Sequence, residues 1–311
     1  MSRIYFAELA IKAKALQANG QAYEDLFTDI MTRRDSDFRR IQAYGCYGDG
    51  KNDGFNPNTG AYYQVHAPLQ LSKETTLATS VKKLENDFNG LFENWNDTVP
   101  IKSFKYVMND KLNGCPALVE QKIAELKSKF SDIDFKTFTL TDLIAEFKLL
   151  DLESQQAIVG FFPTMESLTT VSIPSIRRTV DHLKTILGEL PKSCENFDQE
   201  EYDRKIEFNF LSSEISELMK KAETQTYLLE DFFNSNQDKN FKSTVRDNFN
   251  FIYKTQRESH LILTERNAPI VFHNILDLSG YDRTLEAQNA ALILMSYFFI
   301  SCDIYEKPDR E

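Results

Sequence analysis

The sequence contains few cysteines, and their spacing excludes the sites that cysteine usually builds. Among 311 residues there are four, Cys46, Cys115, Cys194 and Cys302. No two stand in a Cys-x-x-Cys arrangement, so a structural zinc site is not expected. There is also no Gly-x-Ser-x-Gly nucleophile elbow and no recognisable cysteine triad. Hydrolases of those two kinds are therefore set aside.

Long apolar runs are lacking as well. The longest, residues 290–300, is interrupted by Ser296 and falls short of the roughly 18–20 residues that a bilayer span needs. The first residues lack the basic and apolar regions of a secretory signal. We therefore expect a cytoplasmic protein with reduced thiols and no membrane segment.

Positive charge is scarce. The chain has 36 Lys and Arg against 47 Asp and Glu, a net charge of −11. Residues 195–231 alone hold eleven acidic and four basic side chains, which gives 4 − 11 = −7. This balance has the wrong sign for a protein that grips a nucleic-acid backbone over its whole surface. Any such binding must be local or be supplied by a partner.

What the sequence does contain is an α/β pattern followed by an all-α pattern. Strands are expected at residues 38–47, 62–66, 101–108 and 135–139, between helices at 4–18, 21–33, 72–95, 116–130 and 141–150, the last capped by Thr141. Strands that alternate with helices indicate an α/β layer whose later strands are parallel. Beyond a loose segment at 151–174, helices are expected at 176–190, 214–234, 241–263, 269–280 and 285–299. The chain is thus predicted to form two domains, residues 1–163 and 164–311.

Candidate chemistry gathers in the first of these domains. A loop reading Gly-Asp-Gly-Lys-Asn-Asp-Gly places Asp53 before a strand that carries Gln64 and His66. Residues two apart in a strand point to one face, so Gln64 and His66 should face together across a hairpin from Asp53. Glu24 lies beside the apolar face of a preceding helix. Such oxygen donors can hold a divalent metal beside a water-activating group.

These residues carry a resemblance. Gly-Asp-Gly-x-x-Asp-Gly, followed by an aromatic strand with Gln-x-(basic residue), resembles the core of the Mrr branch of the PD-(D/E)xK restriction-endonuclease-like fold. The resemblance implies that Asp53, Gln64, His66 and Glu24 are catalytic candidates, and that Asp53, Gln64 and Glu24 bind Mg²⁺ or Mn²⁺. In that family a lysine stands where this chain has His66. Lys51 or Lys73 could reach in instead.

Each of these residues also has a purely structural interpretation. Glu24 suits the first turn of a helix, where a negative charge is favoured by the helix dipole. Asp53 could be a loop aspartate, Gln64 a strand amide and His66 a half-buried ring. The other histidines, His182, His260 and His273, have no His or Cys partner at i+4, so a metal cluster there is not expected.

A basic district in the first domain is the candidate surface for double-stranded DNA. It consists of Lys102, Lys105, Lys111, Lys122, Lys127, Lys129 and Lys136, with Arg177 and Arg178 just beyond. Such charges usually form a solvated face, but they could also steer a duplex toward Asp53.

The second half carries another resemblance. Residues 205–212, Lys-Ile-Glu-Phe-Asn-Phe-Leu-Ser, together with the apolar run 290–299 and residues 302–306, Cys-Asp-Ile-Tyr-Glu, resemble a helical C-terminal domain of the bacterial ABC three-component conflict systems. The resemblance implies an ABC/SMC-type ATPase and a small middle component as partners. A homo-oligomer is left open.

Two functional hypotheses follow from the two resemblances. The first is a bacterial antiviral-defence effector, a metal-dependent DNA endonuclease licensed by the ATPase. The second is a catalytically inactive, nuclease-like adaptor that binds DNA or the partner complex. A stand-alone restriction enzyme is disfavoured by the acidic charge.

Overall fold

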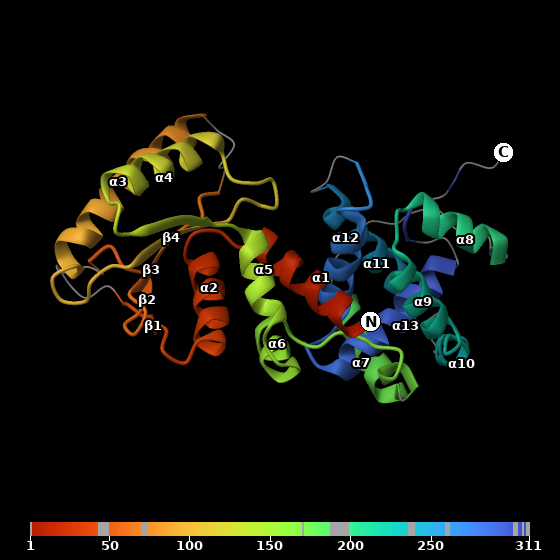
Figure 1. Ribbon diagram of the computed structural model, residues 1–311. Helices are drawn as coiled ribbons and strands as arrows, with labels where there is room; N and C mark the ends of the chain where they lie inside the picture. Colours follow the sequence, from red (N-terminus) through yellow and green to blue (C-terminus); the bar gives the residue numbers. More distant parts are fainter. Residues whose placement is uncertain are drawn as a thin grey trace. The chain divides into compact units, whose positions relative to one another are not determined.

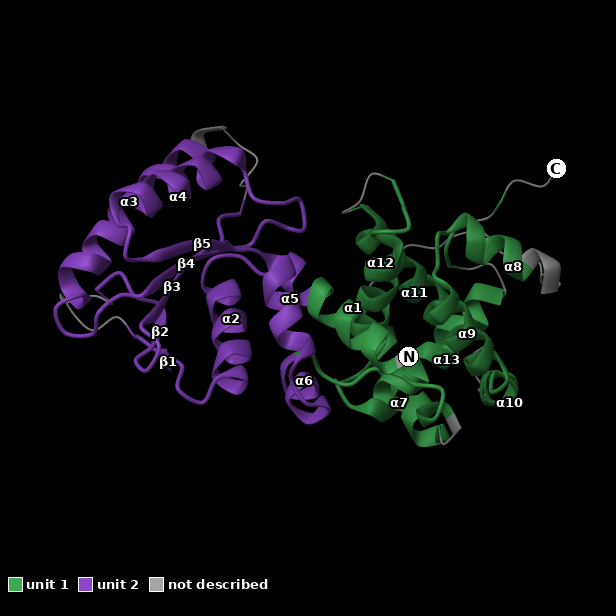
Figure 2. Ribbon diagram, viewed as in Figure 1, with its two compact units in different colours: residues 1–13, 159–311 green, residues 14–158 purple. Residues whose placement is uncertain are grey.

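The computed structural model describes residues 2–42, 50–69, 74–169, 171–186, 199–235, 240–258, 262–300, 304–306 and 308. They form two compact units, shown in Figures 1 and 2. The sheet unit comprises residues 14–158, and the helical unit comprises residues 1–13 and 159–311. Helix α1 (Ser2–Gln17) contributes residues to both units. The domains 1–163 and 164–311 stay a prediction.

The sheet unit is built around five strands in the order β1-β2-β3-β4-β5. They are β1 (Arg39–Arg40), β2 (Gly54–Asn56), β3 (Ala61–His66), β4 (Ser103–Met108) and β5 (Asp134–Phe138). The first three pair antiparallel, whereas β3, β4 and β5 pair parallel. The predicted α/β layer with parallel later strands is therefore confirmed. The strand expected at 38–47 is described only as the short β1, since residues 43–49 lie outside the described residues.

Helices cover both faces of this sheet, as Figure 1 shows. One face carries α3 (Glu74–Trp95) and α4 (Ala117–Lys129), and the other carries α2 (Gln21–Arg34). The apolar stripe of α3 explains its position, because Leu84, Phe88 and Leu91 are buried against the sheet. Burying each such side chain contributes about 1.5–3 kcal/mol. On the opposite face the ring of Phe27 in α2 packs 5.5 Å from that of Tyr63 in β3.

Two shorter helices, α5 (Leu140–Lys148) and α6 (Leu152–Val159), complete the sheet unit. Helix α5 starts with a capping box between Thr139 and Asp142, so the expected cap at Thr141 is wrong by two residues. The backbone N–H of Leu140 also donates to Asp110 Oδ1, at 2.9 Å. Helix α6 occupies part of the segment expected to be loose.

The loop after β4 is a cap for another helix. Lys111 Nζ donates to the backbone oxygens of Leu16 and Ala18 at 2.8 and 2.7 Å, and Asn109 donates to those of Ala15 and Ala18. These carbonyls belong to the end of α1, where the helix itself supplies no donors. Burial lowers the pKa of Lys111 to about 8. Lys111 thus stabilises the fold and is not a surface charge of the basic district.

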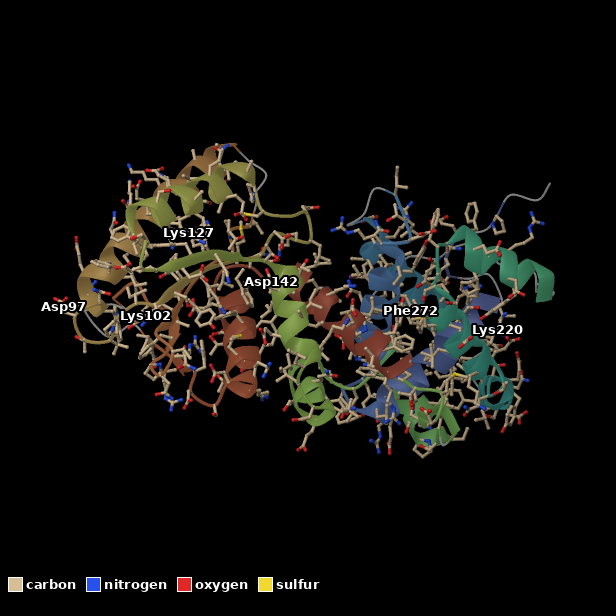
Figure 3. The ribbon with its side chains drawn as sticks, viewed as in Figure 1. Asp97, Lys102, Lys127, Asp142, Lys220 and Phe272 are labelled. Carbon is tan, nitrogen blue, oxygen red and sulfur yellow. The ribbon has the colours of Figure 1, made fainter. Side chains whose placement is uncertain are left out.

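The helical unit surrounds one apolar helix. Helix α13 (Leu285–Ile300) is buried on all sides from Ala287 to Phe299, as expected for a helix that is hydrophobic all round. Around it lie α7 (Ile173–Lys184), α8 (Gln199–Phe208), α9 (Ser213–Glu223), α10 (Tyr227–Asn234), α11 (Phe241–Glu258) and α12 (Ala268–Ser279). The fully buried Phe272 of α12, labelled in Figure 3, belongs to this core. The predicted helical half is therefore confirmed, although α7 ends at Lys184 and not at residue 190. Among the described residues, no helix is both long and apolar enough to cross a bilayer.

Candidate functional site

Asp53 and Gln64 contact each other directly at the β2–β3 hairpin. Asp53 Oδ2 accepts hydrogen bonds from Gln64 Nε2 at 2.7 Å and from the backbone N–H of Val65 at 2.5 Å. Asp53 precedes β2 and Gln64 lies within β3, so the antiparallel pairing brings the two side chains together. Both residues are buried, with exposures of 7% and 5%. The structure thus brings together two of the four candidates from the sequence.

Several buried polar atoms beside this pair have no hydrogen-bond partner among the described residues. They are Gln64 Oε1, both amide atoms of Asn52 and the hydroxyl of Tyr106, the β4 residue in register with Gln64. A buried polar atom without a partner costs about 1–3 kcal/mol, so its presence in a fold requires a reason. A ligand that accepts or donates at these atoms is one such reason.

His66 lies on the same face of β3 as Gln64, but its side chain is hydrogen-bonded to α3 and not to Asp53 or Gln64. Its Nε2 is 2.7 Å from Ser80 Oγ in α3, and that hydroxyl donates to the backbone oxygen of Thr76. Because the hydroxyl has only one proton, His66 Nε2 must be the donor in the first bond. Burial, followed by the charge of Lys83, lowers the pKa of His66 to about 4, against an opposing effect of Asp87. The ring is therefore neutral at pH 7.

Lys51 and Lys83 both form ion pairs with one buried carboxylate. Asp87 of α3 lies 3.0 Å from Lys51 Nζ and 2.9 Å from Lys83 Nζ. Lys73, the other lysine that could reach in, lies outside the described residues, as does Asp49 of the glycine-rich loop.

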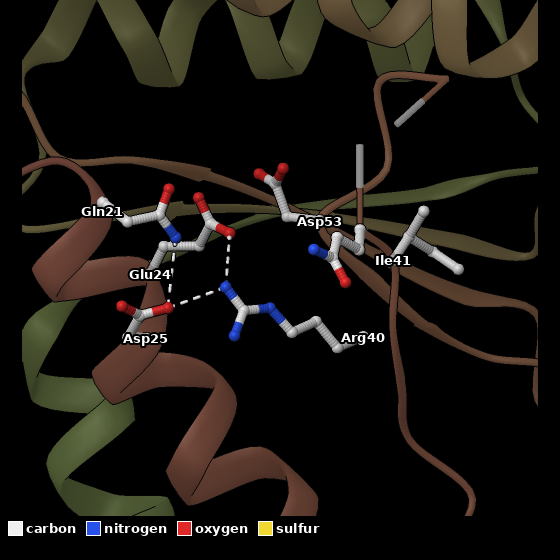
Figure 4. A pocket seen from close by; sticks show the side chains of 7 residues that line it. Gln21, Glu24, Asp25, Arg40, Ile41 and Asp53 are labelled. Carbon is white, nitrogen blue, oxygen red and sulfur yellow. Dashed lines mark hydrogen bonds and ion pairs between the residues drawn. The ribbon is translucent and has the colours of Figure 1, made fainter. Parts of the chain in front are cut away.

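Glu24 is near Asp53 but is bonded to an arginine. A pocket of about 440 Å³ is lined by Gln21, Glu24, Asp25, Arg40, Ile41, Gln42 and Asp53. In Figure 4, Glu24 and Asp25 project from α2 toward the guanidinium of Arg40, with distances of 3.4 and 2.7 Å. Arg40 therefore competes with any metal ion for Glu24. Sequence reasoning did not single out Arg40, because nothing local distinguishes it from an ordinary surface arginine.

The donor set can be tested against the metal ion that the first resemblance implies. Mg²⁺ prefers oxygen ligands and often uses only one or two protein groups, completing its shell with water and substrate phosphate. Asp53 and the partnerless Gln64 Oε1 fit that requirement. Among the described residues, no group of three or more His, Cys, Asp or Glu side chains is arranged to hold a metal. The fit therefore rests on the two-residue donor set and not on a closed cage.

Most of the basic district is neutralised by carboxylates. Lys122 and Lys129 pair with Glu85 and Glu125, and Lys127 and Lys136 pair with Asp134. Lys105 lies over the Tyr63 ring at 5.0 Å. Lysines that already have acidic partners attract phosphate weakly, so this face offers little net charge to DNA.

Comparison with known protein families gave a match in the helical half. A family model described as C-terminal domain 10 of the ABC-three component (ABC-3C) systems matches residues 179–306. This match supports the second resemblance drawn from the sequence. Neither the curated proteins nor the solved structures gave a significant match.

Proposed function

We propose that this protein is the effector of an ABC three-component defence system, with an Mrr-like, metal-dependent DNA endonuclease as its N-terminal head. An ABC/SMC-type ATPase and a small middle component would control it. The similarity of residues 179–306 to an ABC-3C C-terminal domain supports its place as a component of such a system. The observation that supports the nuclease assignment is the buried Asp53–Gln64 pair with its partnerless Gln64 Oε1.

The hydrogen bonds around Asp53 and Gln64 assign a role to each residue of the proposed site. Asp53 and Gln64 would hold Mg²⁺ or Mn²⁺, which when bound supplies Lewis-acid chemistry to a phosphodiester. The Val65 N–H fixes the Asp53 carboxylate, and Gln64 Nε2 holds the amide so that Oε1 remains available. The hydrogen bond to Ser80 fixes the orientation of the His66 ring. Because the ring is neutral at pH 7, it adds no positive charge to the site.

Incubation of the full chain with supercoiled plasmid tests the proposal. We expect cleavage with Mg²⁺ or Mn²⁺ in the presence of the proposed ATPase partner, and loss of cleavage in Asp53→Ala. A matched control is Asp25→Ala, which removes a carboxylate that is exposed in the same pocket. Absence of cleavage with and without the ATPase, or equal cleavage by Asp53→Ala, contradicts the proposal.

A specific observation favours the alternative, a catalytically inactive adaptor that binds DNA or the partner complex. The low pKa of His66 leaves the position of the expected lysine without charge, and a lost catalytic group usually removes more rate than a substitute restores. A His66→Lys variant that gains cleavage, while the natural chain has none, would support the adaptor. A natural chain that cuts DNA would exclude it.

A further inference from the structure

Helix α8 ends in an unusual turn. The backbone N–H of Leu211 donates to the oxygen of Ile206 at 3.1 Å, and that of Phe210 donates to the oxygen of Glu207 at 3.0 Å. These two bonds define a Schellman motif, in which the residue after the helix cap adopts the left-handed conformation. That residue here is Phe210, with φ at 53°.

Phenylalanine is a costly choice for this position. The left-handed conformation strongly favours glycine, and a bulky residue there is strained. Burial offsets only part of this cost, because Phe210 is 43% exposed and Phe208, two residues earlier, is 47% exposed. Backbone strain at a large apolar residue that stays partly exposed is a reason to look for function.

The backbone of the turn that carries these two rings is fixed by hydrogen bonds from buried side chains. Between them, the fully buried Asn209 donates to the backbone oxygens of Lys205 and Glu306, each at 2.8 Å, and accepts from the N–H of Glu306. Lys205 Nζ donates to the oxygens of Phe299 and Ile304. The backbone beneath both rings is therefore fixed before any partner arrives, which lowers the entropy cost of binding.

The two helices that flank this turn, α8 and α9, are acidic overall. Residues 199–223 contain seven acidic and four basic side chains. Of the basic ones, Lys205 is buried and Lys220 pairs with Asp203 at 2.8 Å. A second copy of this chain, with its own net charge of −11, would meet like charge here.

We propose that Phe208 and Phe210 form a docking surface for a partner protein, whose matching segment carries aliphatic or aromatic side chains between lysines or arginines. Aromatic side chains are enriched in interface cores, and opposite charge at the border sets partner choice. The proposal rests on the proposed function, because the partner is one of the other two components of the system.

Binding of the full chain to the two components tests this surface. The ATPase and the middle component of the proposed system are each purified and titrated by calorimetry with the natural chain and with a Phe208→Ser/Phe210→Gly double variant. Glycine relieves the strained φ at 210, so the variant should remain folded. The matched control is Phe251→Ser, which removes a phenylalanine of α11 that is 44% exposed.

We expect the double variant to bind one component at least tenfold more weakly, Phe251→Ser to bind it unchanged, and added salt to weaken the natural complex. Equal binding by the double variant overturns the surface while leaving the proposed function standing. Self-association that the double variant abolishes also overturns it, since the occupant would then be a second copy. If the natural chain binds neither component, the proposed function fails as well.

Discussion

Two buried side-chain pairs, one in each unit, use their polar atoms in different ways. In the helical unit, Lys205 and Asn209 bond to backbone groups of Phe299, Ile304 and Glu306. In the sheet unit, the amide of Gln64 bonds to Asp53 through its nitrogen, while its oxygen has no partner among the described residues. The difference separates a pair that stabilises the fold from a pair that retains bonding capacity.

The first pair also joins two sequence segments that carry the ABC-3C resemblance. Lys205 and Asn209 come from the segment 205–212, and Ile304 and Glu306 come from the segment 302–306. These hydrogen bonds hold the two segments together in the helical unit. Lys205→Met should therefore have the largest effect on stability. It leaves two buried carbonyls without a donor, at about 1–3 kcal/mol each, so we expect a loss of about 3 kcal/mol in the free energy of unfolding. Urea denaturation followed by circular dichroism measures it.

The control for this variant is Lys220→Met in the same unit. Lys220 is a surface lysine paired with Asp203, and exposed ion pairs contribute about 0–1 kcal/mol. If both variants lost a similar, small amount of unfolding free energy, the hydrogen bonds of Lys205 would not be a major source of stability in the helical unit.

The two buried amides offer a closer test. Asn209→Ala should cost about 2 kcal/mol, because the three hydrogen bonds made by the buried Asn209 side chain are lost. Gln64→Leu should cost less than about 1 kcal/mol, because the substitution also removes a partnerless oxygen. Calorimetric titration with Mn²⁺ should show the reverse order, with binding lost in Gln64→Leu and kept in Asn209→Ala. Equal stability costs with unchanged Mn²⁺ binding would contradict the comparison.

The sequence was sufficient for the sheet and for its central contact because both follow from local rules. Alternation in a strand places Gln64 opposite Asp53 across a short turn, and βα alternation predicts parallel pairing of the later strands. The apolar residues of α13 likewise predict a buried helix.

What the sequence could not supply are contacts between distant residues. Arg40 reaches Glu24 sixteen positions away, and Lys111 caps a helix that ends more than ninety positions earlier. Tyr5 in α1 contacts Ser212 of the helical unit, which no local pattern indicates. His66 was expected to act on water, and its bond to Ser80 depends on how α3 lies on the sheet.

The low pKa of His66 predicts a pH effect on stability that a substitution at this position removes. The unfolded chain takes up a proton near pH 6.5, whereas the folded chain does so only near pH 4. The unfolded state therefore binds more protons between these values, and stability falls as the pH is lowered through this window. We expect the natural chain to lose about 1–2 kcal/mol more than His66→Gln between pH 7 and pH 4.5, since partial exposure reduces the full effect. Parallel pH profiles of the two proteins would exclude a buried neutral His66.

The smallest effect concerns the strained turn that Asn209 supports. Phe210→Gly should raise the free energy of unfolding by about 0.5–1 kcal/mol, because glycine adopts a positive φ without the clash of a Cβ atom. Phe208→Gly, made at the last residue of α8, should lower it by up to about 1 kcal/mol, because glycine is a poor helix former. Opposite signs at two exposed phenylalanines two residues apart would show that the helical unit gives up stability at position 210. A loss of stability in both variants would instead mean that the Phe210 ring packs usefully in the isolated protein, and its exposure would no longer require a partner.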